Sequence, residues 1–207
     1  MFQNEFENAV LKYDRDVSRW LDEIQSAHTH RSRYYHTLAH LDYLVAELKP
    51  LQNQFTSWDT VVFAIAYHDF VYNATARDNE EQSAKVAEAR LTEINFPVLE
   101  KARCAEFILA TKKHEPVNFE VDLFTDADLS ILGASPEKYQ QYAADVRKEY
   151  SIYPDLLYKP GRKKVLQYFL EMKQIFKTDE FYEKYERVAR QNLEFEVAGC
   201  SDEWKNR

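Results

Sequence analysis

Apolar side chains recur every three or four residues along most of this chain, which is the period of an amphipathic α-helix. The pattern is clearest over residues 2–25, where successive apolar positions are 4, 4, 3, 4, 3 and 4 residues apart. These positions are Phe2, Phe6, Val10, Tyr13, Val17, Trp20 and Ile24. We therefore expect one long helix there. The polar stretch 26–35 breaks the period and predicts a loop, with His28 and His30 on its surface.

The rest of the chain repeats this pattern between short polar connections, and several boundaries carry helix-capping residues. Pro50 ends one helix, Ser57 is a good N-cap, and Gly133 suits the position after a helix end. The later helices that we expect occupy residues 36–49, 57–71, 79–94, 97–109, 122–132, 135–150, 162–177 and 179–198. The stretch 152–161 predicts a turn. About nine helices and no convincing strand predict an all-α helical bundle.

Composition agrees with this class. Only 3 of the 207 residues are glycine, whereas all-β folds need many turn glycines. The length and a hydrophobic content of 45% fit one domain with a substantial core. We expect a single helical domain over residues 1–207. Its C-terminal helices, about 136–198, would pack on a core of about 30–133 that carries the candidate site.

The charge balance narrows the classes of partner. A net charge of −8 and a sequence pI of about 5.3 argue against general nucleic-acid binding, which needs a basic face. A small anionic substrate is compatible, since one local basic cluster is enough. No apolar stretch approaches the ~18 residues that span a bilayer, and the N-terminus lacks a signal-peptide pattern. We expect a cytoplasmic protein with no membrane contact and with Cys104 and Cys200 as reduced thiols; the oligomeric state is left open.

The most unusual stretch is 61–69, where seven residues without formal charge lead directly into His68 and Asp69. Burying a polar group without a partner costs roughly 2–7 kcal/mol, and burying a charge costs more. The pair therefore needs something to satisfy it, and a metal ion is the obvious candidate.

Other residues offer the remaining ligands. His36 and His40 are four apart on one expected helix, so both side chains should point the same way. Asp126 and Asp128 lie in an otherwise apolar segment. Imidazole and carboxylate together suit divalent ions such as Mn, Fe, Co, Ni or Zn. Two histidines and two aspartates leave open positions where water can be activated, as in a hydrolase.

The order His40, His68-Asp69, Asp128 resembles the signature of the HD superfamily of metal-dependent phosphohydrolases. The resemblance extends over about residues 5–197. Within the superfamily, the chain is similar to an uncharacterised bacterial branch of predicted HD phosphohydrolases. The blocks that carry it are residues 33–40, 66–72, 79–84, 124–133, 147–150, 161–162 and 189–192.

The resemblance implies an all-helical HD-type domain that holds one divalent ion with His40, His68, Asp69 and Asp128. Asp128 is preferred to Asp126 because HD sequences commonly place the last ligand after an alanine. The identity of the ion is open among Mn, Fe, Co, Ni, Zn and Mg. By analogy with the cyclic-nucleotide phosphodiesterase relatives, His36 is a candidate general acid.

Further residues are weaker candidates, each with an ordinary structural alternative. Glu81, or its neighbour Glu80, would orient the attacking water, but both also suit a helix N-terminus. Arg33 would clamp a phosphate rather than serve as a surface arginine. The other candidates for binding substrate are Lys112, His114, Arg147 and Arg162.

The leading expectation is a metal-dependent hydrolase of a phosphomonoester or phosphodiester, such as a nucleotide. In it Asp69 or Asp128 would accept the proton of the attacking water. The alternative is a non-catalytic metal- or nucleotide-binding helical sensor module. Oxygenase chemistry at a diiron site ranks lower, because only His114 and the Glu80/Glu81 pair are at hand as extra ligands.

Overall fold

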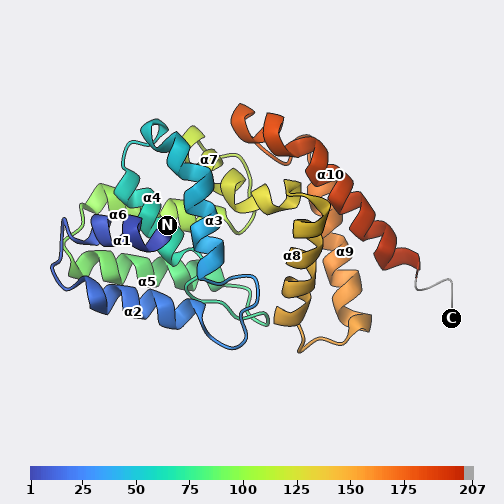
Figure 1. Cartoon of the computed structure of the whole chain (residues 1–207), viewed down its shortest axis with the longest axis horizontal. Coiled ribbons are helices and arrows are strands. Elements are labelled where there is room, and N and C mark those ends of the chain that lie inside the picture. The colour runs from blue at the N-terminus through green and yellow to red at the C-terminus, as the bar shows by residue number, and fades with distance from the viewer. Residues whose placement is uncertain (203–207) are drawn as a thin grey trace. The chain divides into compact units, whose positions relative to one another are not determined.

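The structure, a computed structural model, describes residues 1–202 and the side chains of residues 1–199. Every regular element in that part of the chain is a helix, so the predicted all-α class is confirmed (Figure 1). The described residues form ten α-helices and two short 3-10 helices, against about nine helices predicted. They are α1 (Phe2–Val10), α2 (Val17–His28), α3 (Leu38–Leu48), η1 (Lys49–Gln54), α4 (Trp58–Tyr67), α5 (Asn79–Glu93), α6 (Val98–Ala110), α7 (Phe119–Leu129), η2 (Ser130–Gly133), α8 (Pro136–Glu149), α9 (Asp155–Glu171) and α10 (Asp179–Asp202).

By its internal contacts the chain divides into two compact units, residues 1–127 and the chain from Asp128 onward. The boundary falls within α7. The expectation of a single domain over residues 1–207 stays a prediction. No described helix is both long enough and apolar enough to cross a membrane. Cys104 is buried, which raises the pKa of its thiol, while the side chain of Cys200 lies outside the described residues.

Helix α4 is the buried centre of the first unit. Helices α1, α3, α5 and α6 all contact it (Figure 1), and every residue from Val61 to Tyr67 is buried. Phe63 packs edge-on against Phe6 and Phe96, with ring centroids 6.0 and 5.0 Å apart. A helix that is apolar on all faces is held by packing all round, so α4 gives the His68-Asp69 pair a rigid base. Ser57 caps its start as predicted, accepting the Thr60 N–H.

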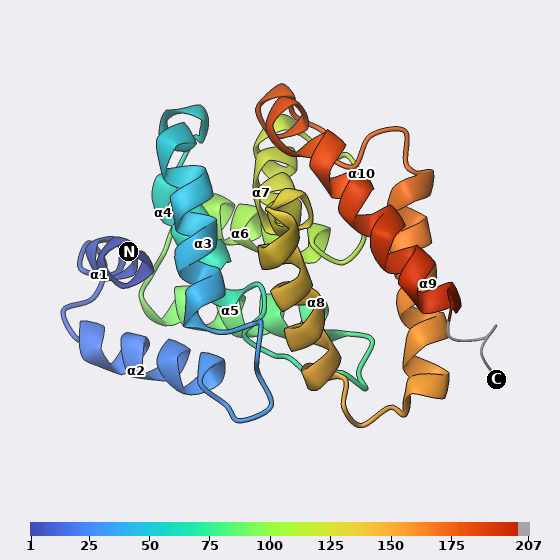
Figure 2. The ribbon, with the colours of Figure 1, turned by 45° about the vertical axis from the view of Figure 1, so that its right-hand side comes forward.

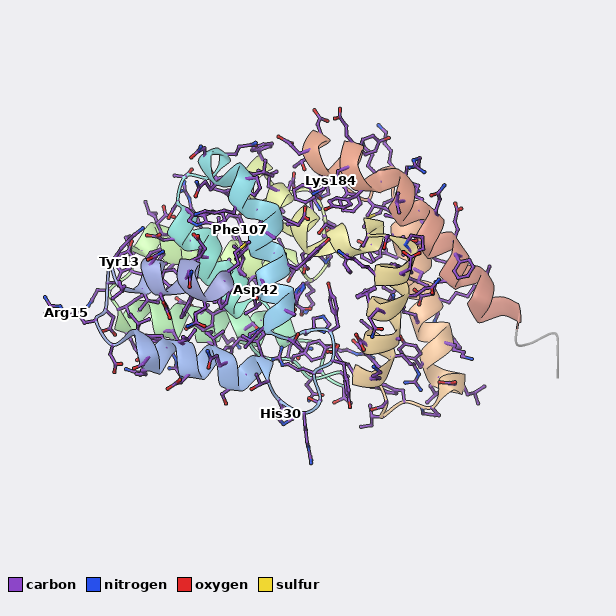
Figure 3. The ribbon with its side chains drawn as sticks, viewed as in Figure 1. Tyr13, Arg15, His30, Asp42, Phe107 and Lys184 are labelled. Atoms are coloured by element: carbon purple, nitrogen blue, oxygen red, sulfur yellow. The ribbon has the colours of Figure 1, made fainter. Side chains whose placement is uncertain are left out.

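The predicted helix over residues 2–25 is two helices, α1 and α2, with a turn between them. Asp14 makes this turn by accepting from the indole N–H of Trp20 (2.8 Å) and from the backbone N–H of Asp16 (3.0 Å). Asp16 then caps α2 by accepting the Arg19 N–H. Figure 3 labels Tyr13 and Arg15 in this turn. The apolar period continues across the break, so periodicity alone could not show it.

In the second unit, α10 runs along η2 and α9 (Figure 2). Glu196 of α10 pairs with Arg162 of α9 at 2.8 Å and accepts a hydrogen bond from the hydroxyl of Tyr139 on α8. One carboxylate thus ties three helices together. The turn predicted over 152–161 is wrong beyond Pro154, because α9 begins directly after this residue and carries Pro160 inside it. Pro160 is the sixth residue of α9, so it lacks the N–H that would bond the Leu156 carbonyl, and the helix continues through it at the loss of one backbone hydrogen bond.

Candidate metal centre

Three of the predicted ligands lie together in the first unit. The Nε2 atoms of His40 and His68 are 3.1 Å apart. Asp69 Oδ2 lies 3.0 Å from the Nε2 of His68 and 3.7 Å from that of His40. Among the described residues, this trio forms a group whose ligand atoms are close enough to share one ion.

The convergence follows from the packing of two helices. His40 lies in the first turn of α3, and His68 is the residue that ends α4, followed directly by Asp69. Helices α3 and α4 are in contact. Leu41 and Leu44, which follow His40 in α3, are fully buried. The apolar face of each helix therefore fixes where its ligand atom lies.

The hydrogen bonding of His68 fixes which of its nitrogens faces the centre. Its Nδ1 lies 3.0 Å from the carbonyl oxygen of Ile65, one turn back in α4. A carbonyl only accepts, so Nδ1 carries the proton and Nε2 presents its lone pair to His40. Two imidazole nitrogens 3.1 Å apart then require a proton or a cation between them. Metal-bound histidines are commonly oriented in this way by a carbonyl on the far nitrogen.

The distances also suit a small divalent ion. Such ions bind imidazole nitrogen and carboxylate oxygen at about 2.0–2.2 Å, so ligand atoms in a tetrahedral or octahedral shell lie about 3.0–3.5 Å apart. Two of the observed separations, 3.0 and 3.1 Å, fall in this range, and the third, between Asp69 Oδ2 and His40 Nε2, is slightly longer at 3.7 Å. Burial alone would raise the pKa of Asp69, but the neighbouring imidazoles of His68, His36 and His40 hold it well below its ordinary value. The donors His40, His68 and Asp69 therefore fit a divalent ion.

His36 reaches the same carboxylate from another direction. The expectation that it shares a helix with His40 is wrong, because α3 begins at Leu38 and Thr37 is its N-cap. Its Nε2 nevertheless lies 3.8 Å from Asp69 Oδ2, and its ring stacks on Tyr72 with centroids 4.3 Å apart. The side chains of His36 and Asp69 are 19% and 20% exposed, against 1% for those of His40 and His68. Solvent therefore reaches the cluster from the side of His36.

Arg33 holds the backbone around the centre. Its guanidinium donates to the carbonyl oxygens of His36 (3.0 Å), Asp69 (2.7 Å) and Phe70 (2.9 Å). It thereby connects the loop before α3 to the end of α4, and it also lies over the ring of Tyr72. The sequence predicted a phosphate clamp here, and the structure shows three backbone carbonyls as partners of that fork. We infer that Arg33 positions the ligands.

The other predicted cations and acids have partners of their own. Lys112 donates to Glu81 (2.5 Å) and to the Arg77 carbonyl (2.7 Å), so Glu81, the candidate for orienting the attacking water, is held in an ion pair. His114 follows α6 in a left-handed conformation, with φ 54°.

Two predicted phosphate ligands lie in the second unit. Arg147 pairs with Asp155 at 2.7 Å, and Arg162 pairs with Glu196. The roles of Arg33, His36, Lys112, His114, Glu81, Arg147 and Arg162 toward a substrate stay predictions.

Asp126 and Asp128, the two candidates for the fourth ligand, fall in different units. Asp126 is fully buried in the first unit, whereas Asp128 is the half-buried first residue of the second. The role of Asp128 as the fourth ligand stays a prediction.

Two features of the site were not foreseen. His28, expected on a loop surface, ends α2 as a fully buried residue whose Nδ1 lies 3.0 Å from the Ile24 carbonyl oxygen. The second feature is the positioning role of Arg33. The burial of His28 could have been predicted from the sequence, because His28 lies four residues after the buried Ile24 and so continues the apolar stripe of α2. By contrast His30 is exposed, in the loop shown in Figure 3.

No family model, curated protein or solved structure matches the chain. The resemblance to the HD superfamily therefore rests on the order of the sequence motifs.

Proposed function

We propose that this protein is a metal-dependent hydrolase of a phosphomonoester or phosphodiester, such as a nucleotide. The observation that carries the proposal is the convergence of two imidazole nitrogens and one carboxylate oxygen within 3.7 Å of one another. The order of His40, His68-Asp69 and Asp128 in the HD-type motif supports it independently of the geometry.

A divalent ion held there would supply Lewis acidity and a bound water of lowered pKa. Asp69, kept ionised by its three imidazole neighbours, is available to take the proton of the attacking water, as is Asp128. His36, whose ring lies against that of Tyr72 at the exposed side of the cluster, would donate a proton to the leaving-group oxygen as the P–O bond breaks. Arg33 holds the two ligand-bearing segments in register.

The main alternative is a metal-binding sensor module without catalysis. A sensor would be expected to seal its ion from substrate, and the burial of His40 and His68 is in keeping with that. The exposure of Asp69 and His36 favours the hydrolase, because it leaves one side of the cluster open.

The test is to purify the full chain without chelator, measure bound metal, and assay phosphate release from nucleotides and simple phosphate esters with several ions. We expect bound or added Mn, Fe, Co, Ni, Zn or Mg to support hydrolysis, and Asp69→Ala to reduce kcat by at least ~100-fold. The exposed His30 provides a matched control, since His30→Ala should keep full activity.

The two functions give different results in this assay. Metal bound at His40, His68 and Asp69 with no hydrolysis under any ion would identify the sensor. Absence of bound metal together with absence of hydrolysis would overturn both, and full activity in Asp69→Ala would remove the assigned site.

A further inference from the structure

The outer face of α6, in the first unit, is unusually apolar. Val98 and Leu99 are 75% and 78% exposed at its start, and Leu109 is exposed near its end. Val117 and Phe119, just after the helix, are also exposed. The opposite face of α6 packs on α4 and α5 (Figure 1). Single exposed apolar residues are ordinary, but a gathered patch of them marks an interaction surface.

The patch includes a shallow, open depression. One open hollow of about 780 Å³ is lined by α6 from Leu99 to Ala110 and by Val117. A second hollow of about 360 Å³, lined by Phe119 and Val121 among others, shares Arg103 and Glu106 with the first. These two charged residues thus line both depressions, of which the first is mainly apolar and the second is about equally polar and apolar. Alanines at 102, 105 and 110 keep the helix surface low, which allows the backbone of another helix to approach closely.

The arrangement is complementary to itself. Two α6 helices packed antiparallel about a point between Cys104 and Ala105 would bring Arg103 opposite Glu106 of the second copy, and Glu106 opposite its Arg103. The same alignment brings Leu99, about 15 Å from Leu109 along the helix, opposite Ala110 at the far end. A two-fold interface requires this kind of self-matching, because each surface patch meets its own copy.

We propose that this face of α6 is the docking surface for a second copy of the chain. The proposal is independent of the metal centre. Arg103 now pairs with Glu100 on its own helix at 3.1 Å, an exposed pair that is weak in water and leaves the arginine available for the partner. Dimerisation follows mass action, so the population of the dimer should rise with concentration.

Sedimentation equilibrium of the full chain over a wide range of concentrations tests the proposal. We expect the apparent mass to rise from 24.6 kDa toward twice that value. Leu99→Glu should raise the dissociation constant at least ~10-fold, because it places a carboxylate in the apolar contact. Leu157, 62% exposed in the second unit, is the matched control; Leu157→Glu should change nothing.

The charged pairs permit a sharper test of the two-fold geometry. Arg103→Glu alone puts like charges opposite one another, and so does Glu106→Arg alone, so each variant should be monomeric. An equimolar mixture of the two variants makes both pairs complementary again, and this mixture should dimerise. The melting temperature of each variant checks that it is folded. This temperature should stay near the wild-type value, since both positions are exposed.

Dimerisation by the mixture but by neither variant alone would establish the antiparallel contact. A wild-type chain that stays at 24.6 kDa at every concentration would overturn the proposal. A dimer that is unaffected by Leu99→Glu and by both charge variants would overturn it as well, because association would then use another surface.

Discussion

Arg33 donates hydrogen bonds to both of the segments that carry the candidate ligands. Replacing it with alanine leaves the carbonyls of His36, Asp69 and Phe70 without their donor. We expect Arg33→Ala to lower the free energy of unfolding by about 1–3 kcal/mol and to weaken metal binding by about 10–100-fold. Urea unfolding and calorimetric titration with Ni²⁺ measure the two effects. Arg31→Ala, an exposed arginine in the same loop, should leave both unchanged.

His28 should make stability depend on pH. Burial lowers its pKa from 6.5 to about 3, and the charge of Arg33 lowers it as well. The folded protein therefore holds His28 neutral, while the unfolded chain takes up a proton below pH 6.5. The contribution to stability is complete above that pH and is lost as pH falls toward 3, by up to about 1.4 kcal/mol per pH unit.

Urea unfolding between pH 7 and pH 4.5 checks the contribution of His28. Carboxylates also titrate in this range, so the informative quantity is the difference between wild type and His28→Gln. That difference should shrink as pH falls, since the variant lacks the proton-binding group. A difference that stays constant with pH would show that His28 does not titrate as expected. His30→Gln, at an exposed position, should not alter the wild-type profile.

The sequence predicted the ligand types better than their surroundings. His68 and Asp69 could be chosen because an apolar run that ends in two ionisable residues needs a partner, and His40 because of its spacing to His36 and its place in the HD-type motif. The carbonyl partners of Arg33 could not be predicted, since every residue has a backbone carbonyl and the sequence does not show which ones accept a hydrogen bond. Whether a basic side chain meets a phosphate or a carbonyl depends on loop conformation, which periodicity does not encode.

At the scale of helices, the effect of replacing a glycine on stability depends on how closely a neighbouring helix approaches it. A Cβ at Gly133 would lie 2.6 Å from the Cβ of Tyr185 on α10, whereas a Cβ at Gly161 in α9 would meet nothing within 4 Å. We expect Gly133→Ala to destabilise the protein by about 1–3 kcal/mol through overpacking. Gly161→Ala should stabilise it by about 0.5–1 kcal/mol, since alanine is the better helix former. Paired denaturant titrations of these variants measure both signs. Equal effects would contradict the close approach of α10 to η2.

Helix existence was predictable, but some helix limits were not. The apolar stripe of α1 continues in α2, so only the side-chain bonds of Asp14 and Asp16 reveal the turn between them. Pro154 and Pro160 suggested a long turn, yet α9 begins directly after Pro154 and continues through Pro160 at the loss of one backbone hydrogen bond. Local hydrogen bonds decide where a helix begins and ends, whereas the apolar stripe shows only which face is buried.

At the scale of the whole molecule, the role of Asp128 as a fourth ligand is a prediction. Hydrogen exchange of the full chain, with and without saturating Mn²⁺ or Ni²⁺, tests it. An ion at 100 times its dissociation constant stabilises the binding state by about 2.7 kcal/mol. We therefore expect slower exchange in residues 36–48 and 64–72, which carry His40, His68 and Asp69. The predicted fourth ligand adds residues 124–133 to the protected set.

Two variants separate the contributions to that protection. His68→Ala should abolish the response to metal in all three segments, because it removes a central ligand. Asp128→Asn should abolish it in residues 124–133 alone, leaving the first unit protected. Protection that never extends to residues 124–133 in the wild type would show that three residues hold the ion without Asp128. The catalytic proposal would then rest on Asp69 as the sole carboxylate able to take the proton of the attacking water, and Asp128→Asn would retain hydrolysis.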